Sequence, residues 1–177
     1  MVNRFFIFFL YFIFFISALM YFTQKTSIYY FLEKELKPYA VIISDEEILD
    51  SGFTLKIEHA NISLKQIQTA SISEVNVKLF AFYNAIDFKD IVLSSVVKSF
   101  IPLHIGMAKV TYSIFAPLNV NAVAVGGLGE VYAQINVLDR TVHVKLIPSK
   151  LMLKNYRSTL HNFVKNKSGE YEYDKTF

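Results

Sequence analysis

The order of hydrophobic and polar positions divides the chain into an apolar N-terminal segment and a longer region of alternating residues. Residues Phe5–Phe22 form a run whose only polar side chains are Ser17 and the tyrosine hydroxyls. As a helix, this run is about 27 Å long, close to the thickness of the hydrocarbon core of a membrane. We therefore predict a transmembrane helix over residues 5–22, after a short tail of residues 1–4.

The end of the apolar run favours an uncleaved anchor over a signal peptide. A signal peptidase requires small residues one and three positions before its cut. Ser17 and Ala18 are small, but the bulky residues Leu19–Phe22 follow them. The lysines after the run outnumber Arg4 before it, and this charge count alone favours a domain on the inner side. The tail is only four residues long, however, so we predict a signal anchor with the C-terminal domain outside.

Residues 23–38 keep a helical spacing and predict a juxtamembrane helical stalk. Ile28, Phe31 and Leu32 share one face of such a helix, and Pro38 ends it.

From Val41 the pattern changes to strict alternation, which is typical of strands with one apolar face. The clearest runs are Phe53–Glu58, Val75–Phe82 and Val110–Ile114, with short turns between them. We predict an antiparallel β-domain over residues 39–148, with a curved or sandwich-like sheet. A single amphipathic sheet must cover its apolar face, either in a closed core or as an open groove for acyl chains, and alternation allows both.

The strongest alternation surrounds Gly126–Gly129, which we interpret as a hairpin loop. Apolar residues fall on odd positions on both sides of this loop, so we predict that they share one apolar groove or core face. These residues are Val123, Val125, Val131, Ile135 and Val137.

Residues 149–177 predict one amphipathic helix over residues 149–165 and a final edge strand over residues 170–177. Ser149 is a suitable N-cap, and cations recur at helical spacing after it. Between Lys145 and Lys167 no acidic residue interrupts the cations, so this face is a candidate contact for lipid head groups or a partner. The candidate contact residues are Lys150, Lys154, Arg157 and Lys165. Tyr171 and Tyr173 lie on the predicted edge strand, which is a candidate for pairing with a partner's sheet.

Composition removes several classes of function. The 177 residues carry a net charge of +3, too weak for a typical nucleic-acid binder, and include no cysteine. The four histidines show no metal-ligand spacing, and no catalytic motif is present. Gly126, Gly127 and Gly129 precede a strand pattern instead of a helix, so they do not indicate a phosphate loop. We predict a protein that is not an enzyme and has no metal or cofactor.

The hairpin Asn119–Val125 and Glu130–Val137, the turn at Asp139 and Arg140, and the strand ending at Ser149 resemble the type II secretion system protein N family. The resemblance covers residues 48–149 and extends to the larger AsmA-like proteins. It implies an anchor in the bacterial inner membrane, a curved periplasmic sheet, and a role in lipid transport or envelope assembly.

These observations lead to two hypotheses of function. The first is an inner-membrane-anchored periplasmic β-domain that binds lipid or a subunit of an envelope or secretion complex. The alternative is a closed structural scaffold in a secretion or motility machine, with no ligand.

Overall fold

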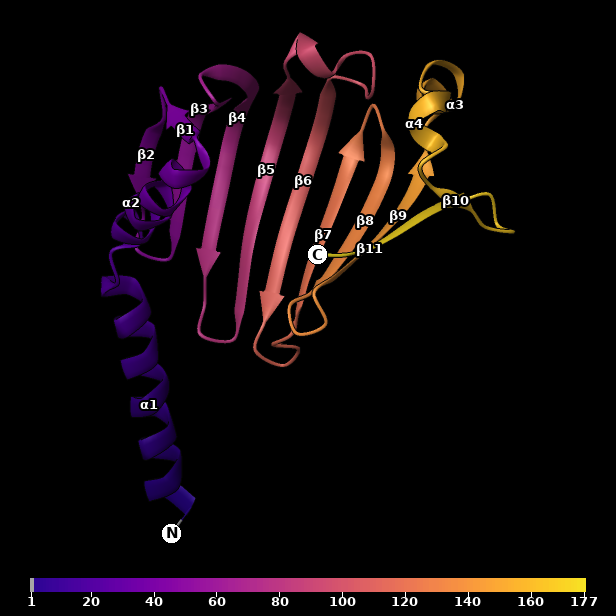
Figure 1. The fold of residues 1–177 in the computed structure, drawn as a ribbon. Coiled ribbons are helices and arrows are strands. Elements are labelled where there is room, and N and C mark those ends of the chain that lie inside the picture. The colour runs from indigo at the N-terminus through magenta and orange to yellow at the C-terminus, as the bar shows by residue number, and fades with distance from the viewer. Residues whose placement is uncertain (1) are drawn as a thin grey trace.

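The computed structural model of the protein describes residues 2–177, and it consists of an apolar helix followed by one large antiparallel sheet (Figure 1). Helix α1 spans Val2–Phe22, and its segment Arg4–Phe22 is long and apolar enough to cross a membrane. None of this segment is buried against the rest of the protein. The helical segment α2 (Lys25–Leu36) and the 3₁₀ turn η1 (Lys37–Tyr39) lead from it into the sheet.

The sheet has eleven strands in the order β1-β3-β4-β5-β6-β7-β8-β9-β11-β10, and β2 pairs with β3 beside β1. The predicted mainly-β fold with an N-terminal apolar helix is therefore confirmed. The strands are β1 (Val41–Ser44), β2 (Glu47–Asp50), β3 (Thr54–Leu64), β4 (Ile67–Leu79), β5 (Tyr83–Leu93), β6 (His104–Ser113), β7 (Asn119–Gly126), β8 (Gly129–Asn136), β9 (Thr141–Pro148), β10 (Val164–Lys165) and β11 (Tyr171–Thr176).

The sheet is curved and forms a single layer (Figure 1). One edge is formed by β1 and β2 and the other by β10. These edges do not pair with each other in the described chain, so the sheet does not close into a barrel. A second sheet that would complete a sandwich is also absent from residues 2–177. Of the arrangements that the sequence allowed, the structure adopts the open one.

Part of the curvature comes from a row of irregular residues across β3 to β6. Each of these strands carries one residue outside the regular pairing at the same level: His59, Ser73, Asp90 and Gly106. His59 and Asp90 have positive φ angles of 58° and 49°. An extra residue of this kind bends a strand and increases its twist. On β3 it leaves Ile57 and Ala60, on either side, buried on the same face.

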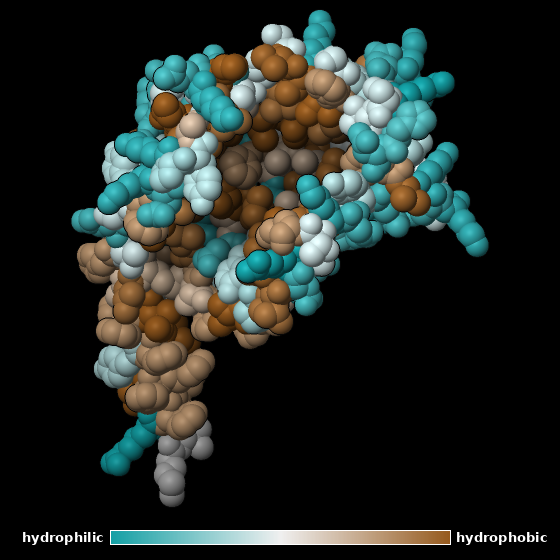
Figure 2. All heavy atoms as spheres, viewed as in Figure 1, coloured by the Kyte–Doolittle hydropathy of each residue, from teal (hydrophilic) through white to brown (hydrophobic). Residues whose placement is uncertain are grey.

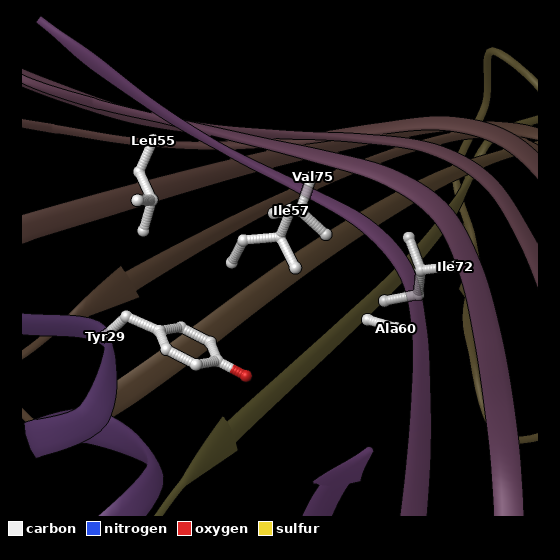
Figure 3. Packing of buried hydrophobic residues seen from close by; sticks show 6 residues of the cluster. All are labelled: Tyr29, Leu55, Ile57, Ala60, Ile72 and Val75. Atoms are coloured by element: carbon white, nitrogen blue, oxygen red, sulfur yellow. The ribbon is translucent and has the colours of Figure 1, made fainter. Parts of the chain in front are cut away.

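The concave face is covered at its two ends by separate hydrophobic clusters. At the first end, Tyr29 of α2 packs on Leu55 and Ile57 of β3 and on Ile72 and Val75 of β4 (Figure 3). Burial, with a hydrogen bond to Glu46, raises the pKa of the Tyr29 hydroxyl above its usual range. Residues 23–38, predicted as a juxtamembrane helical stalk, are mostly helical, and α2 packs on the end of the sheet through Tyr29.

At the other end, Met152 and Leu160 pack on Leu146 of β9. They belong to helices α3 (Lys150–Asn155) and α4 (Arg157–Leu160), with Ser149 as the N-cap of α3. The prediction of one helix from residue 149 to 165 is wrong. The backbone leaves helical geometry at Tyr156, with φ −125° and ψ 35°, so that both short helices can turn apolar residues toward the sheet.

The convex face carries a ladder of paired charges. The Nζ atoms of Lys56 and Lys89 lie 3.3 and 2.5 Å from the carboxylate oxygens of Glu74. Those of Lys78 and Lys109 lie 2.8 and 3.6 Å from the carboxylate oxygens of Asp87. Hydrogen bonds from Lys89 and Asn76, with the nearby charge of Lys56, lower the pKa of the Glu74 carboxyl to about 2. Cross-strand pairs of opposite charge stabilise neighbouring strands, so this face is built to remain in water.

The joint between α1 and the sheet is held by a buried cation. Lys25 is only 2% exposed, and its ammonium donates to the carbonyl oxygens of Met20, Thr23 and Gly52. A lysine at this position interacts favourably with the unpaired carbonyls at the end of α1. The carboxylate of Asp50 accepts hydrogen bonds from the backbone N–H groups of Lys25 and Thr26, which cap the start of α2. The ring of Tyr21 packs on Phe53, with centroids 5.4 Å apart.

The tight β7–β8 hairpin gives a test of the fold. Gly129 has a φ of 108°, and an added Cβ would lie 2.1 Å from the carbonyl oxygen of Ile147. Because strain and overlap both act there, we expect Gly129→Ala to lower the free energy of unfolding by about 3 kcal/mol. Gly169 also has a positive φ, but a Cβ there meets no atom within 4 Å, so Gly169→Ala should cost about 1 kcal/mol.

Thermal unfolding of the full chain in detergent micelles, followed by circular dichroism, measures both variants. Equal losses for the two variants would show that this hairpin register is not the one that folds.

Candidate functional site

The centre of the concave face is apolar and only half-buried. Residues that are partners on neighbouring strands point to the same face of the sheet. Two rows of such apolar residues cross strands β5 to β9 between the capped ends. One row runs Phe88, Ala108, Ala124, Val131 and Leu146, and the other runs Ile86, Val110, Ala122, Ala133 and Val144. Only Leu146, under α3 and α4, is fully buried in these rows. Solvent therefore reaches the apolar centre of the sheet.

Small side chains deepen this part of the face. Ala108 pairs with Ala124, and Ala122 with Ala133, so that four alanines are neighbours at the centre of the sheet. Larger side chains, such as Phe88 and Leu146, stand at the ends of the rows. Figure 2 shows the resulting hollow, lined mainly by hydrophobic residues, between the parts of the chain that hold α2 and α3. We call the hollow lined by the two rows the trough.

The five residues predicted to share one apolar face do not do so. Val131 lies on the concave face, and so does Ile135, which pairs with Val120 and Val142. Val123 and Val125 pair with Tyr132 and Glu130 and lie on the convex face. Val137 lies beyond the end of β8 and is 58% exposed.

The error comes from the hairpin loop. Gly126 pairs with Gly129, so only two residues, Gly127 and Leu128, connect the strands. With a two-residue connection, odd positions on one strand face even positions on the next, and the apolar partners of Val131 and Ile135 are Ala124 and Val120. Ala122 and Ala124 of β7 mark the concave face of this strand. Their side chains are small, so the valines beside them define the more hydrophobic face in the sequence pattern.

A basic cavity of about 590 Å³ lies beside the last strands, at the α3–α4 end of the concave face. Its walls combine apolar and cationic side chains, namely Leu153, Arg157, Leu160, His161, Phe163, Lys165 and Tyr171. The Lys165 ammonium lies 5.8 Å from the centroid of the Tyr171 ring, and Arg157 Nε donates to the carbonyl of Leu153. A cavity with this lining fits an anionic group attached to an apolar body.

The structure brings only some of the predicted cations together. Arg157 and Lys165 line the basic cavity, whereas Lys150 and Lys154 are exposed on α3 and lie outside it. Within residues 2–177, none of these four cations forms an ion pair with a carboxylate. The lysines of the convex face, by contrast, are already paired with the carboxylates of Glu74 and Asp87.

The two tyrosines of the predicted edge strand have different surroundings. Tyr171 has neighbours on both sides, Leu146 of β9 and Lys165 of β10, so its backbone is not an edge. The two-residue strand β10 ends its pairing at Glu172, and residues 173–176 pair only with β9 in the described chain. The Tyr173 ring packs against the ring of Phe163, with centroids 5.6 Å apart. Only the outer backbone of residues 173–176 remains as an edge.

A possible cation cluster elsewhere is weakened by its own neighbours. Ligand atoms of Glu47, Glu58 and His59 lie within 4.8 Å of one another at the surface. Lys56 already pairs with Glu58 at 2.5 Å, which neutralises the more enclosed of the two carboxylates.

Comparisons of the chain with family models, with curated proteins and with solved structures find no match.

Proposed function

We propose that this protein is a membrane-anchored lipid-binding protein that holds acyl chains in the trough. The observation that carries the proposal is the half-buried apolar centre of the sheet, which the chain itself leaves uncovered although both ends are capped. A contiguous apolar surface that solvent reaches is typical of a site that a ligand or partner covers. The alanine floor leaves space for a flexible chain, and the attached helix α1 keeps the trough beside a membrane.

The basic cavity completes the site in this proposal. Arg157 and Lys165 supply charge without a carboxylate partner in the described residues, beside the apolar wall of Leu160 and Phe163. An anionic head group gains charge-assisted hydrogen bonds there while its acyl chains lie against the concave face. The ligand class is thus an anionic amphiphile, such as a phospholipid.

For the cellular setting, we propose a signal anchor in a bacterial inner membrane, with the sheet in the periplasm. Support comes from the apolar helix itself and from the absence of cysteine, which is compatible with an oxidising compartment. A periplasmic place beside an envelope or secretion complex agrees with the resemblance drawn from the hairpin and turn residues. A protein subunit that fills the trough is the competing occupant, and the following experiment separates it from lipid.

The two faces of the β7–β8 hairpin provide a matched pair of substitutions. Ile135→Glu puts a carboxylate on the concave face, in the row next to the trough, whereas Val125→Glu puts one on the convex face, next to solvent. A charge among acyl chains is costly, so Ile135→Glu should lose co-purifying lipid by at least about tenfold while Val125→Glu retains it. Native mass spectrometry of the full chain, released from detergent, measures the lipid adduct.

A second variant separates the loss of lipid binding from unfolding of the protein. Ala133→Phe fills the floor of the trough without adding a charge, and circular dichroism verifies that it folds. Retention of lipid by a folded Ala133→Phe protein, or the absence of any lipid from the unaltered chain, contradicts the proposal. Stoichiometric co-purification of a protein in place of lipid would assign the trough to a partner subunit.

The head-group site is tested by charge removal. Arg157→Gln with Lys165→Gln removes two cations from the basic cavity, and Lys150→Gln with Lys154→Gln removes two from outside it. We expect the first pair to reduce the preference for phosphatidylglycerol over phosphatidylcholine by about tenfold, since two charge-assisted contacts are lost. The second pair should leave the preference nearly unchanged. Equal effects of the two pairs would mean that diffuse charge, not the cavity, attracts the lipid.

A further inference from the structure

The turns at one end of the sheet carry large apolar side chains that belong to neither hydrophobic cluster. Because neighbouring strands alternate in direction, the β2–β3, β4–β5, β6–β7 and β8–β9 turns all lie at the same end. Lys25 and Tyr21 join α1 to the β2–β3 turn, so this is also the end that faces α1 (Figure 1).

We call the apolar side chains of these turns and of the C-terminus the rim. Its main members are Phe80, Phe82, Phe115, Leu118, Leu138 and Phe177. Phe115 is 84% exposed and Leu138 is 70% exposed, which is costly in water for side chains of this size. The turn segments 80–82, 114–118 and 137–140 contain only two charged residues, Asp139 and Arg140. They form the least charged end of the sheet, since the opposite end carries Lys65, Lys98 and the cations of α3.

The rim is an ordered surface and not a set of loose loops. The rings of Phe82 and Phe115 stack with centroids 6.3 Å apart, and the backbone N–H of Ile114 donates to the carbonyl of Phe82. The N–H of Val137 donates to the carbonyl of Leu118, at 2.8 Å. The N–H of Phe177 donates to the carbonyl of Arg140, at 2.9 Å. These bonds join three turns and the C-terminus and hold their apolar side chains outward.

The position of α1 decides what covers the rim. Its 19-residue segment Arg4–Phe22 is about 28 Å long, barely the thickness of a hydrocarbon core. In the view of Figure 1, the β4–β5 and β6–β7 turns reach lower than the end of α1 that joins the sheet. In Figure 2 hydrophobic residues continue from α1 to the lower margin of the sheet. When α1 crosses a bilayer, the rim is therefore level with the boundary between head groups and acyl chains.

We propose that the rim inserts into the surface layer of the same membrane that α1 spans. The sheet then stands on the bilayer on two supports, the helix and the rim, and the α1 end of the trough meets the lipid surface directly. Aromatic side chains are favoured at this depth of a membrane, which agrees with the phenylalanines of the turns. This proposal rests on α1 as the anchor of the proposed function, but it does not depend on a lipid in the trough.

Site-specific labels test the proposal, because the chain contains no cysteine of its own. Phe115→Cys and, separately, Phe100→Cys are labelled with the fluorophore NBD in the otherwise unaltered full chain. Phe100 is the matched control, since it is also an exposed phenylalanine, at 61%, but lies in the β5–β6 connection at the opposite end of the sheet. Both proteins are reconstituted into vesicles of phosphatidylethanolamine and phosphatidylglycerol, with and without lipids that carry a nitroxide on carbon 5 of the acyl chain.

We expect the label at position 115 to be quenched by the nitroxide lipid and to be about tenfold less accessible to aqueous iodide than the label at position 100. Equal iodide quenching at the two positions would overturn the proposal. Protection of position 115 from both quenchers would also overturn it, because the rim would then be covered by protein.

The same labels separate this proposal from that of the trough. With Ile135→Glu added, the rim label should remain quenched by the nitroxide lipid even when no lipid co-purifies. Loss of the membrane contact in this variant, in protein whose circular dichroism is unchanged, would show that the rim has no independent affinity for the bilayer.

Discussion

A single sheet with one apolar face can be stable in water only if that face is covered, and this chain covers it incompletely. Tyr29 and its neighbours cap one end, and Met152 with Leu160 caps the other. The convex face cannot serve as an alternative core, because lysines and carboxylates are paired along it. The apolar centre between the caps is thus the feature from which the fold and the proposed function both follow.

The buried Lys25 gives the open sheet a defined place relative to α1. Its ammonium joins carbonyls from the end of α1 to the carbonyl of Gly52, while Asp50 holds the start of α2. Because α2 in turn packs through Tyr29 on β3 and β4, the position of α1 relative to the sheet is fixed. A free stalk would let the domain rotate, whereas this joint fixes which end of the strands faces α1.

Much of the architecture could be predicted from periodicity, since strands with one wet face alternate and a membrane span is uniformly apolar. The faces of β7 and β8 could not, because their relation depends on a two-residue connection at Gly127 and Leu128. The break at Tyr156 also has no local signal, as it is imposed by packing on β9. Two cations of the basic cavity, Arg157 and Lys165, could be predicted from their helical spacing. The same spacing also selected Lys150 and Lys154, and only the tertiary fold places these two outside the cavity.

The trough floor also shows where periodicity is weakest. Four alanines meet there from β6, β7 and β8, and each is unremarkable in its own strand. Their effect arises only when the register places them side by side between larger neighbours such as Phe88 and Leu146. A hollow of this kind is a property of the pairing between strands and not of any one segment.

The most direct test of the account is photo-crosslinking in living bacteria from the floor of the trough. A photoreactive amino acid at Ala122 faces the concave side, and one at the adjacent Asn121 faces the convex side. The account predicts lipid-sized adducts, found by mass spectrometry, at position 122 and none at position 121. Adducts to another protein at position 122, or equal lipid labelling at both positions, would contradict it.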